Sequence, residues 1–266
     1  MTIDVHTHAF PDELAPRAVE ALNSEIPREA WAVLDGTVSD LVRSMDEAGI
    51  ERSVICSVAT APKQVEPILR WSLEVGDGRV IPFGSVHPDC ADPAAEARRI
   101  ADAGLRGIKL HPQYQEFAVD ERRMWPLYEA VAETDLILTF HAGRDIAFPP
   151  DDDRAAPRRI LAVHRDFPTM PVVAAHMGGW KMWDEVLATL AGTDVYLETS
   201  YTFDTCDGGL IERILESHPP ERILFGTDSP WRGQKETLEL VREAFPDPDA
   251  RRLVLGENAR RLLGID

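Results

Sequence analysis

Eight short apolar segments rich in β-branched residues alternate with eight segments of helical periodicity, and this alternation constrains the fold of the 266-residue chain most strongly. The strand-like segments cover residues 2–8, 52–59, 79–87, 105–111, 135–141, 171–176, 194–200 and 222–228. The helical segments cover residues 39–49, 64–76, 93–104, 121–133, 156–167, 183–192, 209–217 and 234–245. Repeated strand–helix–strand order is typical of parallel βαβ units. Eight units predict an α/β fold of the (β/α)8 TIM-barrel type.

An open, doubly wound sheet is the main alternative to a closed barrel. No GxGxxG motif follows the first strand-like segment, so a dinucleotide-binding fold has little support. The Pro- and Asp-rich segment 148–157 has the composition of a loop after the fifth strand. Since no Pro/Gly/Ser-rich linker divides the chain, we expect residues 1–266 to form a single domain.

The charge balance restricts the partners of this protein. There are 46 acidic and 28 Lys or Arg side chains, which gives a net charge of -18. Such a charge argues against nucleic acid or an anionic membrane as a partner. No apolar run is long enough to span a bilayer, no secretory signal pattern opens the chain, and Cys56, Cys90 and Cys206 form no CxxC pair. These features predict a cytoplasmic protein with reduced thiols.

Polar residues gather where the predicted strands end. Active sites of parallel barrels lie at the C-terminal ends of the strands. The residues found there are His6, His8, Lys109, His111, His141, His176 and Asp228. Five of the eight histidines in the chain belong to this set. Their convergence predicts a metal site at the barrel mouth.

The first strand-like segment, IDVHTHAF at residues 3–10, places two imidazoles close together. Successive side chains of a strand point to opposite faces. The alternation therefore predicts that Asp4, His6 and His8 share one face. By the same argument, Lys109 and His111 share a face of the fourth strand. Two imidazoles on one face can bind one ion.

The donor types suit a divalent transition metal. Imidazole nitrogen and carboxylate oxygen bind Zn, Mn, Fe or Co, and we expect zinc, with one or two ions. Asp228 can act as a ligand or as a base that takes a proton from a metal-activated water. Lys109 has two interpretations. Carboxylation by CO2 would make it an anion that bridges two metals, whereas a free amine would pair with a carboxylate or an anionic substrate.

Five motifs together resemble the amidohydrolase superfamily. They are HTH at 6–8, FHAG at 140–143, AHMGG at 175–179, FGTDSPW at 225–231 and GENARRLLGI at 256–265. The nearest branch is the amidohydrolase-related group, which includes lyases similar to aminocarboxymuconate-semialdehyde decarboxylase. The resemblance runs from residue 4 to residue 264 and implies a (β/α)8 barrel with one or two divalent metals.

The resemblance also implies roles for individual residues. The positions that match the usual metal ligands are His6, His8, His141 and Asp228. His176 matches a histidine that binds a second metal in binuclear members and acts as a general acid or base in mononuclear lyases. Lys109 matches a carboxylated lysine by position, although the neighbouring His111 departs from that pattern.

Four further residues are candidates for substrate binding. Arg144 follows His141 and could bind a substrate carboxylate, although a residue there is commonly a surface charge. Trp180 and Trp231 could form walls for an aromatic or apolar substrate, or pack under a loop. His111 completes this group.

We expect a metal-dependent hydrolase that cleaves a small amide, ester or lactone, with Asp228 and His176 as catalytic residues. The alternative is a metal-dependent, non-oxidative decarboxylase of an unsaturated or aromatic acid. A barrel that binds metal without catalysis has little support, because every expected catalytic position is filled. The expected partner is a small-molecule substrate, and a homodimer is a reasonable default.

Overall fold

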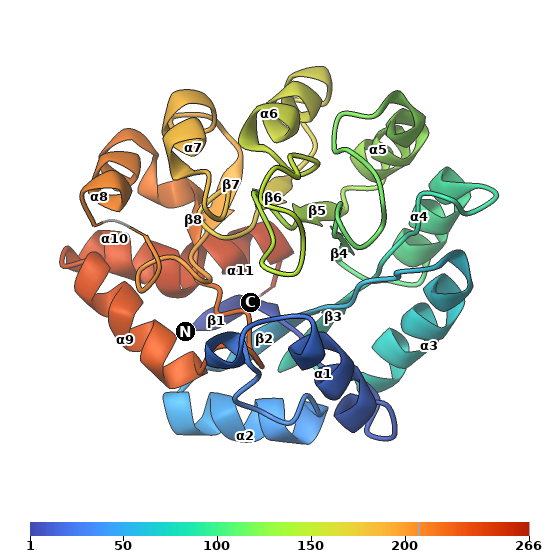
Figure 1. Cartoon of the computed structure of the whole chain (residues 1–266), viewed down its shortest axis with the longest axis horizontal. Helices are drawn as coiled ribbons and strands as arrows, with labels where there is room; N and C mark the ends of the chain where they lie inside the picture. The colour runs from blue at the N-terminus through green and yellow to red at the C-terminus, as the bar shows by residue number, and fades with distance from the viewer. Residues whose placement is uncertain (207, 266) are drawn as a thin grey trace.

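The computed structural model describes residues 1–206 and 208–265, and its centre is a ring of parallel strands (Figure 1). The strands are β1 (Ile3–Thr7), β2 (Arg52–Cys56), β3 (Val80–Phe83), β4 (Gly107–Leu110), β5 (Ile137–Phe140), β6 (Val172–Ala174), β7 (Tyr196–Glu198) and β8 (Ile223–Leu224). They pair in the orders β1-β2-β3 and β4-β5-β6-β7-β8. Each strand is shorter than its predicted segment, so most of the polar residues follow the strands in the loops.

Backbone hydrogen bonds join these two sets of strands into a closed barrel. Between β3 and β4, the Gly84 N–H donates to the Gly107 carbonyl and the Lys109 N–H donates to the Gly84 carbonyl, both at 2.9 Å. Between β8 and β1, the Val5 N–H donates to the Phe225 carbonyl at 2.9 Å. The predicted (β/α)8 fold is therefore confirmed.

Helices form a ring around the strands (Figure 1). The eight that follow the strands are α2 (Val38–Ala48), α3 (Val65–Val75), α4 (Pro93–Asp102), α5 (Trp125–Glu133), α6 (Pro157–Asp166), α7 (Trp183–Thr189), α8 (Gly208–Ser217) and α9 (Gln234–Ala244). These lie within the predicted helical segments or extend one residue beyond them. Three helices were not predicted, namely α1 (Ala15–Ser24), α10 (Pro248–Arg252) and α11 (Asn258–Leu263). Among the described residues, no helix combines the length and the apolar character that a membrane span requires.

Local sequence signals explain where these helices begin and end. The Thr37 hydroxyl accepts a hydrogen bond from the Asp40 N–H and caps α2 at its N-terminus. The same helix ends at Gly49, whose φ of 71° lies in the left-handed region that glycine adopts without steric cost. At α4, the Asp92 side chain accepts from the Ala95 N–H and a proline occupies the first turn.

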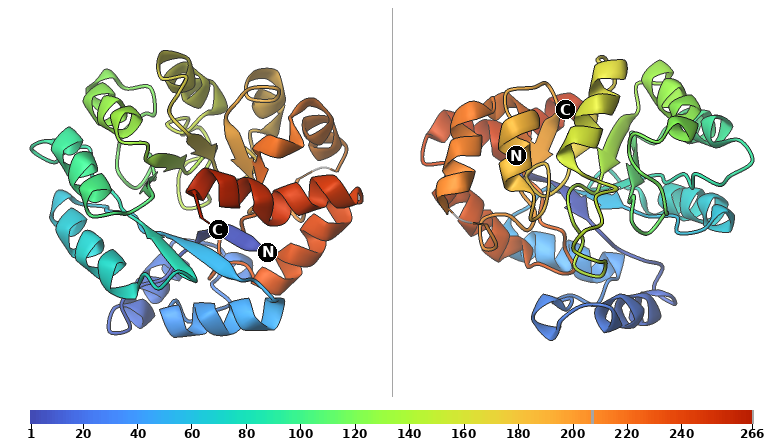
Figure 2. Two further views of the ribbon diagram at one scale, coloured as in Figure 1. Left: turned by 180° about the vertical axis from the view of Figure 1, so that it is seen from behind. Right: turned by 45° about the horizontal axis from the view of Figure 1, so that its top comes forward.

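Two apolar clusters separate the inside of the barrel from its outside. The larger cluster packs outward-facing strand residues such as Ile108, Leu110 and Phe140 among apolar helix residues. The smaller joins residues from β1, β2, β3, β5, β6 and β8, which meet only inside a closed barrel. Ala259 and Leu263 of α11 belong to the smaller cluster. Helix α11 therefore covers one end of the barrel interior, and Figure 2 shows it across that end from behind.

A bulge in β1 corrects the predicted alternation of its side chains. Asp4 pairs with Ser53 and Thr7 pairs with Ile55, so β1 has one extra residue between these two pairs. Asp4 consequently points outward, where its carboxylate accepts a hydrogen bond from Gln234 of α9 at 2.8 Å. His6 points into the barrel. The prediction that Asp4 shares a face with His6 is wrong, because the extra residue reverses the orientation partway along the strand.

Candidate active site

A cavity of about 570 Å³ opens at the C-terminal ends of the strands. All ten residues predicted for catalysis, metal binding or substrate binding line it, namely His6, His8, Lys109, His111, His141, Arg144, His176, Trp180, Asp228 and Trp231. Residues from five strands and their loops thus meet around one space. Whether each of them has its predicted role stays a prediction.

Three donor atoms lie close enough together to bind one cation. His8 Nε2 is 3.1 Å from His6 Nε2 and 3.0 Å from Asp228 Oδ1, and His6 Nε2 is 3.3 Å from the same oxygen. A divalent ion bonded to nitrogen and oxygen at about 2.0–2.2 Å brings its ligands to separations of this order. The donor set therefore fits a divalent ion.

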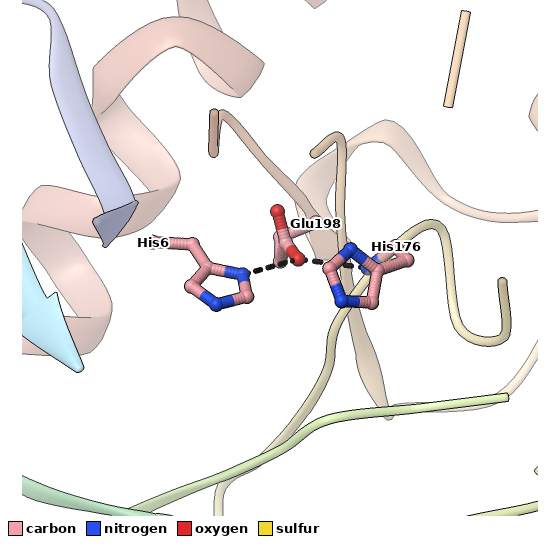
Figure 3. Close-up of side chains that lie close together, drawn as sticks. All are labelled: His6, His176 and Glu198. Atoms are coloured by element: carbon pink, nitrogen blue, oxygen red, sulfur yellow. Dashed lines mark hydrogen bonds and ion pairs between the residues drawn. The ribbon is translucent and has the colours of Figure 1, made fainter. Parts of the chain in front are cut away.

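Glu198 determines which nitrogen of His6 faces this donor set. Its Oε1 atom lies 2.9 Å from His6 Nδ1 and 2.7 Å from the backbone nitrogen of His176 (Figure 3). A carboxylate only accepts, so His6 donates from Nδ1 and keeps a lone pair on Nε2. A carboxylate behind a ligating imidazole fixes its tautomer and increases its basicity. The same carboxylate also fixes the backbone at His176.

A chain of hydrogen bonds continues from Glu198 through Ser200 to His176. The Ser200 hydroxyl donates to Glu198 Oε1 at 2.7 Å and lies 2.8 Å from His176 Nδ1, so it accepts the proton of that nitrogen. His176 Nε2 then lies 3.0 Å from His141 Nδ1. The carbonyl oxygen of Arg144, 3.0 Å from His141 Nε2, can only accept, so the proton of His141 is on Nε2. His176 Nε2 and His141 Nδ1 therefore face each other with two lone pairs.

A second group of donors adjoins the first. His111 and His141 stack with ring centroids 4.1 Å apart, and Asp145 Oδ2 lies 3.3 Å from His111 Nε2 and 3.9 Å from His141 Nε2. His141 Nε2 is also 3.0 Å from the carbonyl oxygen of Arg144. In this structure His141 groups with His111 and Asp145, whereas His6 belongs to two other groups, one with His8 and Asp228 and one with His176 and Glu198.

Burial keeps the site histidines neutral. It lowers the pKa of His6, His111, His141 and His176 well below the ordinary value, and Lys109 adds to the effect at each of them. For Asp228, burial opposes ionisation, but His6, His8 and Lys109 outweigh it and lower the pKa to about 2. Neutral imidazoles beside a carboxylate are the protonation states that metal binding requires.

Lys109 is buried inside the barrel, with its side chain 1% exposed. Its Nζ lies 3.0 Å from His6 Nε2. In this position the amine forms a hydrogen bond with the His6 Nε2 lone pair that a metal would use. Lys109 must therefore move away from His6 Nε2 or be carboxylated when an ion binds there.

Cys56 is close to the site. It ends β2 and lines the cavity. Burial raises the pKa of its thiol to about 12, so it stays protonated at neutral pH. A protonated thiol is not a metal ligand. The possible ligands are therefore the nitrogen and oxygen atoms of the histidines and Asp228.

The backbone is strained at two site residues. His176 has a φ of 57° and Asp228 a φ of 66°, both in the left-handed region. Residues other than glycine rarely adopt this conformation and do so at functional sites more than elsewhere. The strained turns direct both side chains into the cavity after the short strands β6 and β8.

Among the residues that the prediction missed, Glu198, Ser200 and Asp145 lie within 3.9 Å of the site histidines. Glu198 and Ser200 belong to the seventh strand-like segment, where the alternation did not show which side chains point inward. Their position at a strand end was the available signal. Asp145 lies in the loop after β5, four residues past His141, where no periodicity applies.

Solved structures of similar fold are found at low sequence identity. An uncharacterised TIM-barrel protein from Bordetella bronchiseptica is 22% identical with a TM-score of 0.75, covering 99% of this chain and 98% of that one. The 5-carboxyvanillate decarboxylase LigW from Sphingomonas paucimobilis is 16% identical with a TM-score of 0.71, covering 100% and 99%.

A dihydroxybenzoic acid decarboxylase from Polaromonas sp. JS666, solved with manganese and the inhibitor 2-nitroresorcinol, is 17% identical with a TM-score of 0.73. The alignment covers 99% of this chain and 96% of that one. At these identities the likeness establishes the fold. No curated protein matches the chain at a significant level of sequence similarity.

The sequence itself matches a family profile over nearly its whole length. The family is described as Amidohydrolase, and the match covers residues 3–265. That range includes the strand-end histidines, Asp228 and the C-terminal helices, so the predicted resemblance is confirmed. The chain belongs to the amidohydrolase family.

Proposed function

We propose that this protein is a metal-dependent, non-oxidative decarboxylase of an aromatic or unsaturated carboxylic acid. The observation that carries the proposal is one cavity that combines a donor set for a divalent ion, a buried neutral His176, and the aromatic walls Trp180 and Trp231. The names of the decarboxylases with the same fold add support. The hydrolase that we first expected is thus the second candidate.

The ligands of the ion are His6, His8 and Asp228, with His141 as a further candidate. A divalent ion bound there would supply a Lewis acid that orients the substrate carboxylate and a neighbouring oxygen. Asp228 suits the role of ligand because its pKa of about 2 makes it a poor proton donor at neutral pH.

His176 is the residue suited to move the proton. As a neutral imidazole it takes the proton of a substrate hydroxyl at Nε2 and returns it to the carbon that bears the carboxylate. The bond between this carbon and the carboxylate then breaks and CO2 leaves. The electron pair of the bond passes to the ring and its oxygen, which takes a proton from water. Ser200 and Glu198 hold His176 in the required tautomer throughout.

The remaining lining residues suit a polar, aromatic ligand. Within the described part of the chain, His111 Nδ1 and Trp180 Nε1 are buried nitrogen atoms without a hydrogen-bond partner. An oxygen-rich substrate in the cavity would satisfy such atoms, whose burial without a partner is costly. Arg144 is exposed at the edge of the cavity and can meet a second acidic group.

The experiment is a turnover assay with the metal-loaded protein on a panel of hydroxybenzoates and unsaturated acids. Decarboxylation predicts CO2 release and, in D2O, one deuterium at the carbon that held the carboxylate. We expect His176→Asn to keep its metal and to lose activity by about 100-fold or more. If that variant retains full activity, the proton transfer assigned to His176 is wrong.

Hydrolysis remains a second candidate because of Lys109. Its buried Nζ lies beside His6 Nε2. The resemblance to the amidohydrolase superfamily implies that hydrolytic members carry a carboxylated lysine at this position. Carboxylation requires CO2, so a binuclear hydrolase should bind a second equivalent of metal only when bicarbonate is present. Esters, lactones and amides assayed in H2 18O would then yield products labelled with 18O, without CO2 release from the acids.

A further inference from the structure

The cavity has an apolar arm that the decarboxylation step does not use. Beyond the histidines, the same cavity continues between α1 and α3. The residues that these two helices contribute are all apolar, and we call them the apolar arm: Ala18, Ala21, Leu22, Pro67, Ile68 and Trp71. The arm is continuous with the donor set, because one cavity includes both.

Helix α1 turns its apolar face to this cavity and not to the protein core. Leu14, Ala18, Ala21 and Leu22 have the i, i+4, i+7, i+8 spacing of one helix face, and all four line the cavity. Of the ten residues of α1, all of them described, Ala15 alone is buried. Figure 2 shows α1, in dark blue, lying apart from the ring of barrel helices. An amphipathic helix that faces a cavity leaves apolar surface for a ligand.

Hydrogen bonds hold this wall in place. Glu25 is the first residue after α1. Its Oε2 atom accepts a hydrogen bond from the hydroxyl of Tyr114, in the loop after β4, at 3.0 Å. The Ala32 N–H donates to the Asn23 side chain at 3.0 Å. Tyr114 itself lines the cavity. The C-terminal end of α1 is therefore tied to the barrel loops, and the arm is a formed part of the cavity.

The size of the cavity also exceeds the needs of a small acid. Pockets of roughly 300–1,000 Å³ enclose ligands of drug size, and this cavity measures about 570 Å³. A single-ring acid bound at the donor set would leave the apolar arm to water. Apolar walls favour a ligand that displaces this water.

We propose that the apolar arm binds an apolar substituent of several carbon atoms on the acid substrate. The substrate is then an acid whose carboxylate lies at the histidines and whose substituent lies between α1 and α3. The placement of the carboxylate rests on the proposed function, whereas the arm itself rests on the cavity walls. The proposal thus narrows the substrate class to acids with an extended apolar part.

The test measures binding of 4-alkylbenzoates to the metal-loaded protein by calorimetry, with benzoate, 4-propylbenzoate and 4-pentylbenzoate as probes. Each methylene group buried in the arm should raise the affinity about threefold to fourfold. Ala18→Phe fills the arm and should abolish this gain while benzoate binds as before. Arg17→Phe is the matched control, because Arg17 neighbours Ala18 on α1 but is exposed and does not line the cavity.

Thermal melting shows whether each variant is folded, and Ile68→Phe fills the arm from the α3 side if Ala18→Phe unfolds. An affinity that does not depend on alkyl length in the unmodified protein would overturn the proposal. The proposal would also be overturned if Arg17→Phe lost the increase in affinity with alkyl length as fully as Ala18→Phe does. A dimer in solution that buries the α1 face, with an affinity that does not depend on alkyl length, would overturn it as well.

The outcome is separable from that of the proposed function. A length-dependent affinity without CO2 release from any acid would support the arm and contradict decarboxylation. CO2 release from the hydroxybenzoates, together with an affinity for the alkylbenzoates that does not depend on alkyl length, would do the reverse.

Discussion

His6 Nδ1 lies 2.9 Å from Glu198 Oε1, and this contact joins β1 to β7 behind the candidate metal site. The same oxygen accepts the backbone N–H of His176 at 2.7 Å, so one buried carboxylate orients a residue of β1 and a residue that follows β6. Glu198 has no solvent exposure. Because Glu198 lies inside the protein, water cannot replace its carboxylate. Its loss should therefore weaken metal binding.

Glu198→Gln should weaken metal binding by about 10- to 100-fold. The amide oxygen can replace one carboxylate oxygen as an acceptor, but the NH2 group that replaces the other faces a hydrogen-bond donor, the His176 or the Ser200 backbone N–H. The measurement is competition between the protein and a chelating dye of known affinity. Glu216→Gln, at an exposed position on α8, is the control and should bind metal as the unmodified protein does. An unchanged affinity in Glu198→Gln would mean that this carboxylate does not orient His6.

Gly226→Ala should have the same effect through a steric route. A Cβ atom at this position would lie 2.1 Å from Glu198 Oε2 and 3.1 Å from His6 Cβ, so the carboxylate must move. We expect weaker metal binding measured by the same competition. Gly76→Ala, where the nearest atoms are 3.3 Å away, is the control.

Because both changes act on one contact, the double variant Glu198→Gln/Gly226→Ala should lose less affinity than the sum of the single losses. Additive losses would show that Gly226 acts independently of Glu198.

The barrel and its mouth could be predicted from the sequence because both depend on repeated patterns. Eight alternations of two periodicities define the fold, and a histidine at a strand end is visible without coordinates. His111 and His141 follow strands whose alternation is regular, and they line the cavity as expected. At β1, a single extra residue placed Asp4 and His6 on opposite sides, and a bulge of this kind leaves no trace in the pattern of residue types.

Helix α1 was missed for a different reason. Its apolar residues have helical spacing, but α1 is an added helix that precedes α2 between β1 and β2, so the alternation of one strand with one helix does not predict it. Glu198 lies in a strand-like segment, but the direction of its side chain depends on the neighbouring strands. The substrate is set by such loops and added helices, so it could not be read from the barrel pattern.

The three cysteines should differ in reactivity towards a thiol reagent. Cys56 is buried and its thiol pKa is raised to about 12, so it lacks both access and thiolate. Cys90 and Cys206 are partly exposed. A colorimetric thiol assay at pH 8 should therefore detect two thiols in the folded protein and three after unfolding in guanidinium. Cys56→Ala should leave the folded count at two, and a count of one would contradict the burial of Cys56.

The last prediction concerns the dependence of stability on pH at His218, which lies outside the active site. This side chain is 2% exposed, and its Nδ1 accepts a hydrogen bond from the Gly192 N–H at 3.2 Å. Burial lowers its pKa below the ordinary value of 6.5, so the folded state favours the neutral ring. The stabilising contribution is complete above pH 6.5 and is lost as the pH falls below it, because the unfolded chain then binds a proton more readily.

His218→Asn removes this titration and keeps an acceptor for Gly192. The free energy of unfolding, measured with urea at pH 7.5 and 5.5, should fall further in the unmodified protein than in the variant. The difference between the two proteins is at most about 1.4 kcal/mol for one pH unit below 6.5. Effects of the other histidines cancel, since both proteins contain them. An equal fall in both proteins would show that His218 titrates alike in the folded and unfolded states.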